Sequence, residues 1–159
     1  MTSAEPTPSR PSAADAAALY DALTAVHAAI YGYGIVSAHS TPDVNDLVAQ
    51  ALTQHRSQRE MLITLLDARS VTPPPAAAGY QLPIPVDDPT GAANLAVQME
   101  NDTAVAWRAV LEQANPDAGA DNDRAYAVSA LTQCALLAAR WKQVLRAWPV
   151  TQAFPGGSD

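Results

Sequence analysis

The stretch AVHAAIYGYG at residues 25–34 places one histidine and two tyrosines among small apolar residues. Small residues, alanine above all, favour helix and let two helices pack at short distance. Gly32 and Gly34 each cost roughly 1 kcal/mol relative to alanine inside a helix. Close approach of a neighbouring helix is the first explanation for such a cost, and a kink is the second. The stretch is typical of the inner face of a four-helix bundle with a polar group at its centre.

Four helical segments are predicted from this stretch outward. They cover residues 13–39, 42–69, 89–115 and 121–148. Apolar residues recur in each segment at intervals of three or four positions, the spacing of one helix face. In the first segment this stripe consists of Leu19, Leu23, Val26 and Ile30. We therefore expect an all-α fold, an antiparallel four-helix bundle.

Local signals mark the ends of these helices. Ser12 is a candidate N-cap of the first helix, a capping hydroxyl precedes Pro42, and Asp88 precedes a proline at the start of the third. Pro149 stops the fourth helix. Beyond it, Phe154 predicts an ordered hook, because a lone phenylalanine rarely stays in solvent.

Residues 71–88 interrupt the helical pattern with five prolines and read as an extended strap between the second and third helices. A loop of this length is uncommon in a compact domain and usually has a role. A long crossover that carries the chain to the opposite end of the bundle is one such role, and the ferritin-like topology contains one.

Composition narrows the classes of function. The chain has 159 residues, is alanine-rich and carries a net charge of −7, which disfavours nucleic acid and anionic membrane surfaces as partners. Residues 1–12 are predicted to be a disordered leader, and residues 13–156 a single domain. The leader has no apolar run and Cys134 is the only cysteine, so a cytoplasmic protein without disulfides is expected.

A classical di-iron site is unlikely from the sequence. Such a site takes a glutamate from each of two helices and a Glu-x-x-His pair from each of the other two. Residues 124–158 contain no aspartate, glutamate or histidine, and no predicted helix carries Glu-x-x-His. One quarter of the ligand set is therefore missing.

Three other residues are candidates for a buried polar site. His27, His55 and Glu100 come from three predicted helices, and two histidines with one carboxylate form a known ligand set for a single zinc or ferrous ion. The alternative, which we favour, is a polar core layer in which His27 donates to Glu100 or to a carbonyl group and His55 pairs with a tyrosine. Tyr31 and Arg59 are expected nearby, Arg59 paired either with Glu100 or with its sequence neighbour.

No constellation supports nucleophilic or phosphate chemistry. Cys134 lies among apolar residues, where a thiol is inert, and no glycine-rich loop follows a predicted strand. Trp107, Trp141 and Trp148 have helical spacing and favour a core or rim position over a cofactor site. No catalytic residue is assigned, and we lean against an enzyme.

Several short motifs together resemble a known family. They are the stretch at residues 25–34, HRSQRE at residues 55–60, the strap, Glu100, Arg124 and FPG at residues 154–156. The chain resembles the small ferritin-like domain family of unknown function from high-GC Gram-positive bacteria. The resemblance implies an antiparallel four-helix bundle that forms a dimer, without an established activity. Relatives often carry a glutamate where this chain has Val26, a departure that weakens a metal site here.

Two hypotheses of function follow. The first is a non-catalytic bundle that associates with itself or with a protein partner. The second is a degenerate metal-binding or small-ligand-binding bundle that uses His27, His55 and Glu100.

Overall fold

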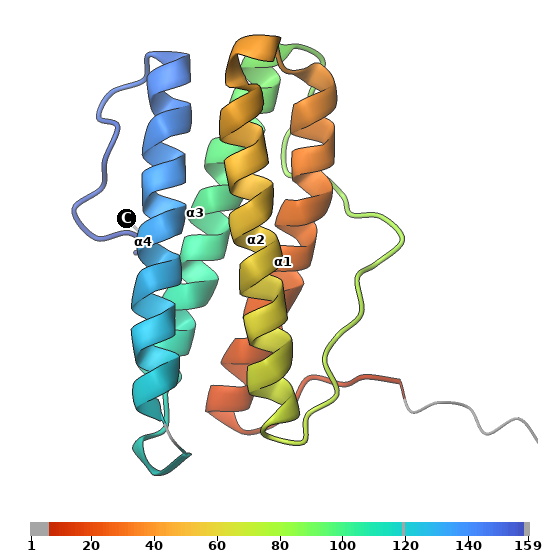
Figure 1. The fold of residues 1–159 in the computed structure, drawn as a ribbon, viewed down its shortest axis with the longest axis vertical. Coiled ribbons are helices and arrows are strands. Elements are labelled where there is room, and N and C mark those ends of the chain that lie inside the picture. The colour runs from red at the N-terminus through yellow and green to blue at the C-terminus, as the bar shows by residue number, and fades with distance from the viewer. Residues whose placement is uncertain (1–6, 119, 158–159) are drawn as a thin grey trace, which may run out of the picture.

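The computed structural model describes residues 7–118 and 120–157, and this part of the chain is helical without a strand (Figure 1). The elements are α1 (Ala14–His39), η1 (Pro42–Val44), α2 (Asn45–Asp67), α3 (Pro89–Gln113), η2 (Pro116–Ala118) and α4 (Ala120–Leu145). The prediction of an all-α fold with four long helices is confirmed. No helix in the described ranges combines the length and the apolar character that a membrane span requires.

The four helices pack side by side into one bundle (Figure 1). The chain runs up α1, down α2, then along the outside through the strap, down α3 and up α4 (Figure 1). α3 makes its largest contacts with α4 and α1, α1 also packs on α2, and α2 and α4 make only a small contact. At one end, Arg69 donates to Asp15 of α1 at 3.2 Å and also to Asp123 of α4, so that it ties the end of α2 to two other helices.

Two of the predicted caps differ from the structure. Asp88 caps α3 as expected, since its side chain accepts a hydrogen bond from the Gly91 amide at 2.6 Å. Ser12 does not cap α1, which begins after Ala13 without a side-chain cap. Thr41 donates to Asp43 instead of capping α2, and a 3-10 turn at Pro42 precedes that helix. The proline at this position suits a tight first turn.

The end of α4 also differs from the prediction. The helix stops at Leu145 because Arg146 adopts a left-handed backbone conformation, with φ of 53°. The Ala147 amide then bonds back to the Lys142 carbonyl at 2.9 Å, as in a common helix-ending motif. Trp148 therefore lies outside the helix and is 80% exposed, so its predicted place in the core line is wrong.

The segment after Pro149 folds back along the bundle (Figure 1), but the aromatic residue does not hold it. Phe154 is 79% exposed, which corrects the expected reason for the hook. Instead, Gly156, with φ of +76°, packs so closely on Ala104 and Arg108 that a Cβ would lie 2.7 Å from the Ala104 carbonyl oxygen. The leader is described from residue 7 onward, where Arg10 pairs with Asp21 at 2.8 Å; residues 1–6 lie outside the described part.

Buried apolar side chains form two clusters, one toward each end of the bundle. One contains Leu19 and Trp107, and the other contains Leu95 and Trp141. The polar residues that are fully buried lie between them in sequence on α2 and α3. The core therefore has a polar middle, as the opening stretch indicated.

Candidate functional site

A buried polar layer crosses the centre of the bundle and takes one side chain from each long helix. The Tyr33 hydroxyl of α1 donates to Glu100 Oε1 of α3 at 2.5 Å, and His55 Nε2 of α2 lies 2.9 Å from the same oxygen. Trp141 of α4 donates its indole N–H to the Tyr33 hydroxyl at 3.0 Å. We call these four residues the central polar layer. Because each contact joins two helices, the layer fixes how the four helices align.

The central polar layer leaves two atoms without a hydrogen-bond partner. Glu100 Oε2 and His55 Nδ1 are buried and bond to no described group. Both residues are 0% exposed. A buried polar atom without a partner costs about 1–3 kcal/mol, and more when it is charged. The layer therefore has capacity to bond one more small polar species.

A second group of polar side chains lies next to this layer. The Gln58 amide of α2 donates to Gln133 Oε1 of α4 at 3.2 Å, and Trp107 of α3 donates to Gln58 Oε1 at 3.1 Å. Cys134 Sγ lies 4.0 Å from the same amide. Gln58 thus links α2 to α4, two helices whose other contacts are few. These hydrogen bonds explain how the whole Gln58 side chain can be buried.

Burial decides the protonation of the two weak acids in this region. Desolvation first, and the neighbouring Glu100 second, raise the pKa of Tyr33 well above its ordinary value. The same two causes, in the same order, raise the pKa of Cys134. Tyr33 therefore remains a donor, and Cys134 remains a thiol and not a nucleophile. This is the inert role that the sequence predicted for the cysteine.

His27 is placed apart from the central polar layer, under the strap. Its Nε2 lies 3.1 Å from the Pro74 carbonyl oxygen, so it bonds to the backbone and not to Glu100. Burial lowers the pKa of His27, the nearby Arg59 lowers it further, and the carbonyl opposes both. Arg59 donates to Glu60 at 2.9 Å on the surface, the second of its two expected pairings.

The tyrosine of the site is Tyr33 and not the expected Tyr31. Tyr31 is 38% exposed and packs on Tyr80 of the strap, with ring centroids 5.5 Å apart. The signal for Tyr33 was present in the sequence: the stripe at positions 19, 23, 26 and 30 continues to position 33. Trp141 had no comparable signal, because apolar spacing does not tell where an indole N–H points.

The three residues considered for a metal do not come together. Glu100 meets His55, while His27 bonds to the strap. Among residues 7–118 and 120–157, no three histidine, cysteine, aspartate or glutamate side chains are grouped so that they could hold a metal ion. The donor set at the centre is one carboxylate and one imidazole, with a tyrosine hydroxyl already bonded to that carboxylate. This set has fewer ligands than a zinc centre or a di-iron centre takes from the protein.

Close packing explains one of the two glycines beside the layer. A Cβ on Gly32 would lie 2.0 Å from Met99 Sδ of α3, so the glycine lets α3 approach. A Cβ on Gly34 would meet nothing within 4 Å, and this residue is exposed. The close approach predicted for the pair therefore applies to Gly32 alone.

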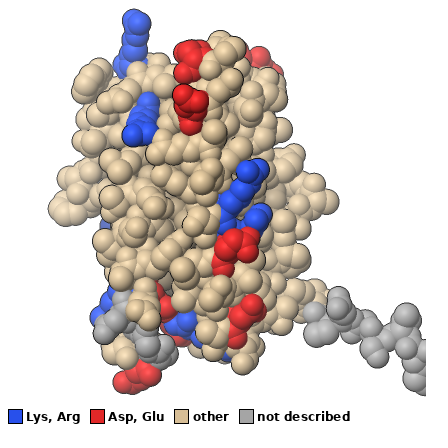
Figure 2. All heavy atoms as spheres, in the orientation of Figure 1, with Lys and Arg blue, Asp and Glu red and all other residues tan. Residues whose placement is uncertain are grey.

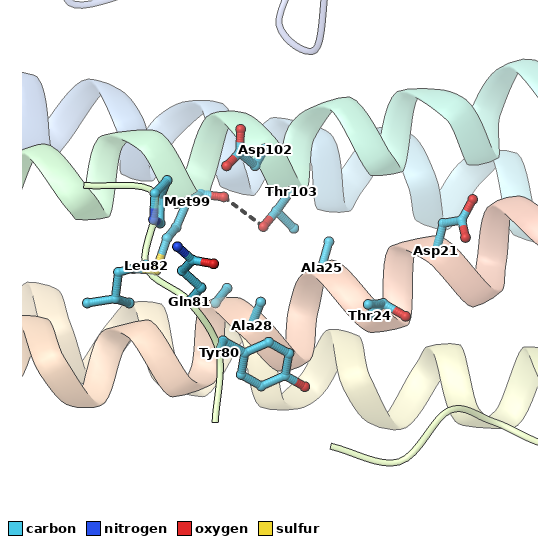
Figure 3. A pocket seen from close by; sticks show the side chains of 12 residues that line it. Asp21, Thr24, Ala25, Ala28, Tyr80, Gln81, Leu82, Met99, Asp102 and Thr103 are labelled. Atoms are coloured by element: carbon cyan, nitrogen blue, oxygen red, sulfur yellow. Dashed lines mark hydrogen bonds between the residues drawn. The ribbon is translucent and has the colours of Figure 1, made fainter. Parts of the chain in front are cut away.

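A hollow lies outside the core, between α1 and α3, where the strap closes one side (Figure 3). It is a groove of about 640 Å³. Its floor is apolar and its rim is acidic; the lining includes Ala25, Ala28, Met99, Leu82, Asp21 and Asp102. Figure 3 shows Asp102 on α3 and Asp21 farther along α1, with Gln81 and Leu82 of the strap between the helices. The sequence analysis did not anticipate this groove, because it depends on the path of the strap.

Comparisons with known proteins identify a family and a similar structure, and neither carries a described activity. The family described as Domain of unknown function (DUF4439) matches residues 18–159. A crystal structure of a conserved hypothetical protein from Mycobacterium tuberculosis is 59% identical, with a TM-score of 0.80. The match covers 89% of this chain and 97% of that one. No curated protein matches the chain.

Proposed function

The chain belongs to the DUF4439 family, and we propose that its domain is a ferritin-like bundle that acts without catalysis, in the cytoplasm, by forming a dimer with a second copy. The ferritin-like assignment is supported by two helix pairs joined by a long crossover between α2 and α3 (Figure 1). The motif-based expectation that the family is found in high-GC Gram-positive bacteria stays a prediction.

The absence of catalysis is supported by the chemistry of the interior. Glu100 and His55 are sealed from solvent at 0% exposure, so a substrate has no access to them. Cys134 is buried with a raised pKa, and burial is the first cause. The groove between α1 and α3 contains carboxylates but no described histidine or cysteine. A general acid and base within reach of one substrate are therefore lacking there.

One observation carries the proposal of self-association. Seven large apolar side chains are exposed among the residues that the structure describes, and all but Tyr31 lie on α3, α4 or the C-terminal segment. They are Val105, Val128, Leu136, Val144, Trp148 and Phe154. Exposed apolar side chains concentrated in one part of a surface indicate an interaction site. Figure 2, which views the face formed by α4, α2 and α1, has few charged side chains, in keeping with a charged fraction of 16%.

Sedimentation equilibrium over a range of protein concentrations tests this proposal. We expect a reversible dimer with a Kd in the micromolar range. Standard interfaces of this kind have apolar centres and polar rims. A chain that stays monomeric at every concentration up to the millimolar range contradicts self-association. Sedimentation is preferable to chromatography here, since an elongated bundle elutes early even as a monomer.

A degenerate ligand site at Glu100 and His55 is the second candidate, and the two buried atoms without partners favour it. Only a small species, such as one water molecule or one cation, suits a position sealed in this way. Elemental analysis of the purified protein tests the cation. Stoichiometric zinc, iron or manganese that is lost in Glu100→Gln supports it; a metal content that this substitution leaves unchanged contradicts it.

A further inference from the structure

The C-terminal segment displays Phe154 on an ordered turn. The Gly157 amide donates to the Phe154 carbonyl at 3.1 Å, and Gly156 is pressed against α3 at Ala104 and Arg108. The backbone is thus anchored while the aromatic ring stays 79% exposed. An aromatic side chain that is held rigidly in solvent loses little conformational freedom on binding and is a common interface anchor.

The groove between α1 and α3 is a receptacle of suitable size and lining. It measures about 640 Å³, and its floor is formed by Ala25, Ala28 and Met99 (Figure 3). Small floor residues leave space that a larger side chain can fill, and the strap closes only one side. An apolar ring therefore fits the groove better than water does.

Phe154 and the groove lie on opposite flanks of the same helix. Asp102, Val105 and Ala109 follow one another on α3 at helical spacing and form its outward face. The groove borders this face at Asp102, and the Phe154 turn borders it at Val105 and Ala109. Val105, between the two, is 51% exposed.

The two features also lie at the same height along the bundle. Tyr33 of α1 bonds to Glu100 of α3, and these helices run in opposite directions (Figure 1). Ala25 precedes Tyr33 by eight residues, and Arg108 follows Glu100 by eight, so both lie about 12 Å toward the same end at a rise of 1.5 Å per residue. Ala25 lines the groove and Arg108 borders the Phe154 turn.

This arrangement has a symmetry consequence. Consider a two-fold axis that runs parallel to α3, just outside its outward face. Across this axis, each flank of α3 in one copy faces the opposite flank of α3 in the other copy, at the same position along the bundle. The Phe154 turn of each copy then faces the groove of the other, and both contacts form at once, as an isologous interface requires. An axis perpendicular to α3 within the interface would instead bring groove to groove.

Charges complement one another in this arrangement. The groove rim carries Asp21, which pairs with Arg10, and Asp102, which has no cationic partner among the described residues. The Phe154 flank carries Arg108, whose pairing with Glu112 is on the surface and therefore weak. Asp102 and Arg108 are offset by about 9 Å along α3, so across the axis the cation of one flank lies near the acidic flank of the other copy without a direct ion pair, which still favours this pairing over a groove-to-groove contact.

Resting on the proposed self-association, we propose that the dimer forms across the outward faces of α3, with Phe154 of each copy seated in the groove between α1 and α3 of the other. The occupant of the groove is thus a second copy of this chain. The interface centre consists of Val105 and Ala109, and the two phenylalanine rings act as its anchors.

Sedimentation equilibrium of the full chain with three substitutions tests the contact. Phe154→Ser removes the anchor and is expected to raise the dimer Kd about 30-fold, the effect of a hot-spot side chain. Ala28→Phe fills the groove from within and is expected to weaken the dimer similarly, with circular dichroism as the check on folding. The control is Trp148→Ser: this residue belongs to the same set of exposed apolar side chains and is equally exposed, but it lies beyond the end of α4 and outside this contact, so the Kd of this variant should change less than about threefold.

Crosslinking gives an independent readout. A mixture of the Phe154→Cys protein and the Ala25→Cys protein should form a disulfide-linked dimer under mild oxidation, whereas either protein alone should not; the buried Cys134 is common to both. If the wild type dimerises but Phe154→Ser leaves the Kd unchanged, the proposed contact is wrong and self-association stands. If the wild type is a monomer, both proposals fall.

Discussion

The centre of the bundle and the strap along its side each involve one histidine, but the two sites differ in what surrounds that side chain. His55 is 0% exposed, and its partner is a carboxylate that also binds Tyr33. His27 is at the edge of the core, and its partner is the Pro74 carbonyl of the strap. Water from the solvent reaches the edge and can replace a lost partner there, whereas the centre is sealed from it. The same residue type should therefore respond very differently to substitution in the two places.

The largest expected effect is that of Glu100→Ala. Removal of the carboxylate leaves the Tyr33 hydroxyl and the His55 ring without an acceptor in the core, and breaking a buried polar pair in this way costs about 3–5 kcal/mol. The free energy of unfolding, measured by urea denaturation, should fall by this amount. Glu100→Gln is the matched control, because it keeps an acceptor oxygen and should cost less. Equal losses in the two variants would contradict a role for the hydrogen bonds.

The two glycines provide a second test of centre against edge, on one helix and two positions apart. Gly32→Ala places a methyl group 2.0 Å from Met99 Sδ, and overpacking of this kind costs about 1–3 kcal/mol, toward the low end where a flexible side chain can move. Gly34→Ala meets nothing within 4 Å and should stabilise the helix by roughly 0.5–1 kcal/mol. Thermal melts of both variants give the comparison. A destabilised Gly34→Ala protein would show that the helix periphery is also packed tightly.

The difference between centre and edge also separates the features that the sequence predicts from those that it does not. The helices, the strap and the Asp88 cap follow from local chemistry: helix formers, prolines and a capping carboxylate. Burial of His55 and Glu100 follows from their places in apolar lines. These features depend on near neighbours in the chain or on one helix face.

Other features depended on contacts between distant residues, and the sequence either left them open, as with the acceptor of His27, or missed them. His27 shares a helix face with apolar residues, but its partner Pro74 is 47 residues away, and the path of the strap decides that contact. Trp148 continued the spacing of α4, yet the left-handed Arg146 ends the helix before it. The groove between α1 and α3 exists only because the strap closes one side. Periodicity identifies which residues face inward and does not identify what they meet.

At the edge, His27→Ala should cost only about 1 kcal/mol of global stability, the net value of one hydrogen bond that water can replace. Its main effect should be local, because the Pro74 carbonyl is one of the groups that hold the strap against α1. Hydrogen exchange or limited proteolysis should show faster opening of residues 71–88, with α2 and α3 unchanged. Uniformly faster exchange in all helices would instead place His27 in the cooperative core.

The smallest effect in this series is that of pH on the strap. The pKa of His27 is lowered in the folded protein, mainly by burial, so the unfolded chain binds a proton more readily. The contribution of neutral His27 to stability is therefore complete above the unfolded pKa, near 6.5, and is lost as pH falls through and below it. His27→Gln keeps a donor for Pro74 but does not titrate. Wild-type stability should thus fall more steeply than that of His27→Gln between pH 7.5 and 5. All other titrating groups are common to both proteins, so parallel curves would show that His27 titrates normally in the folded state.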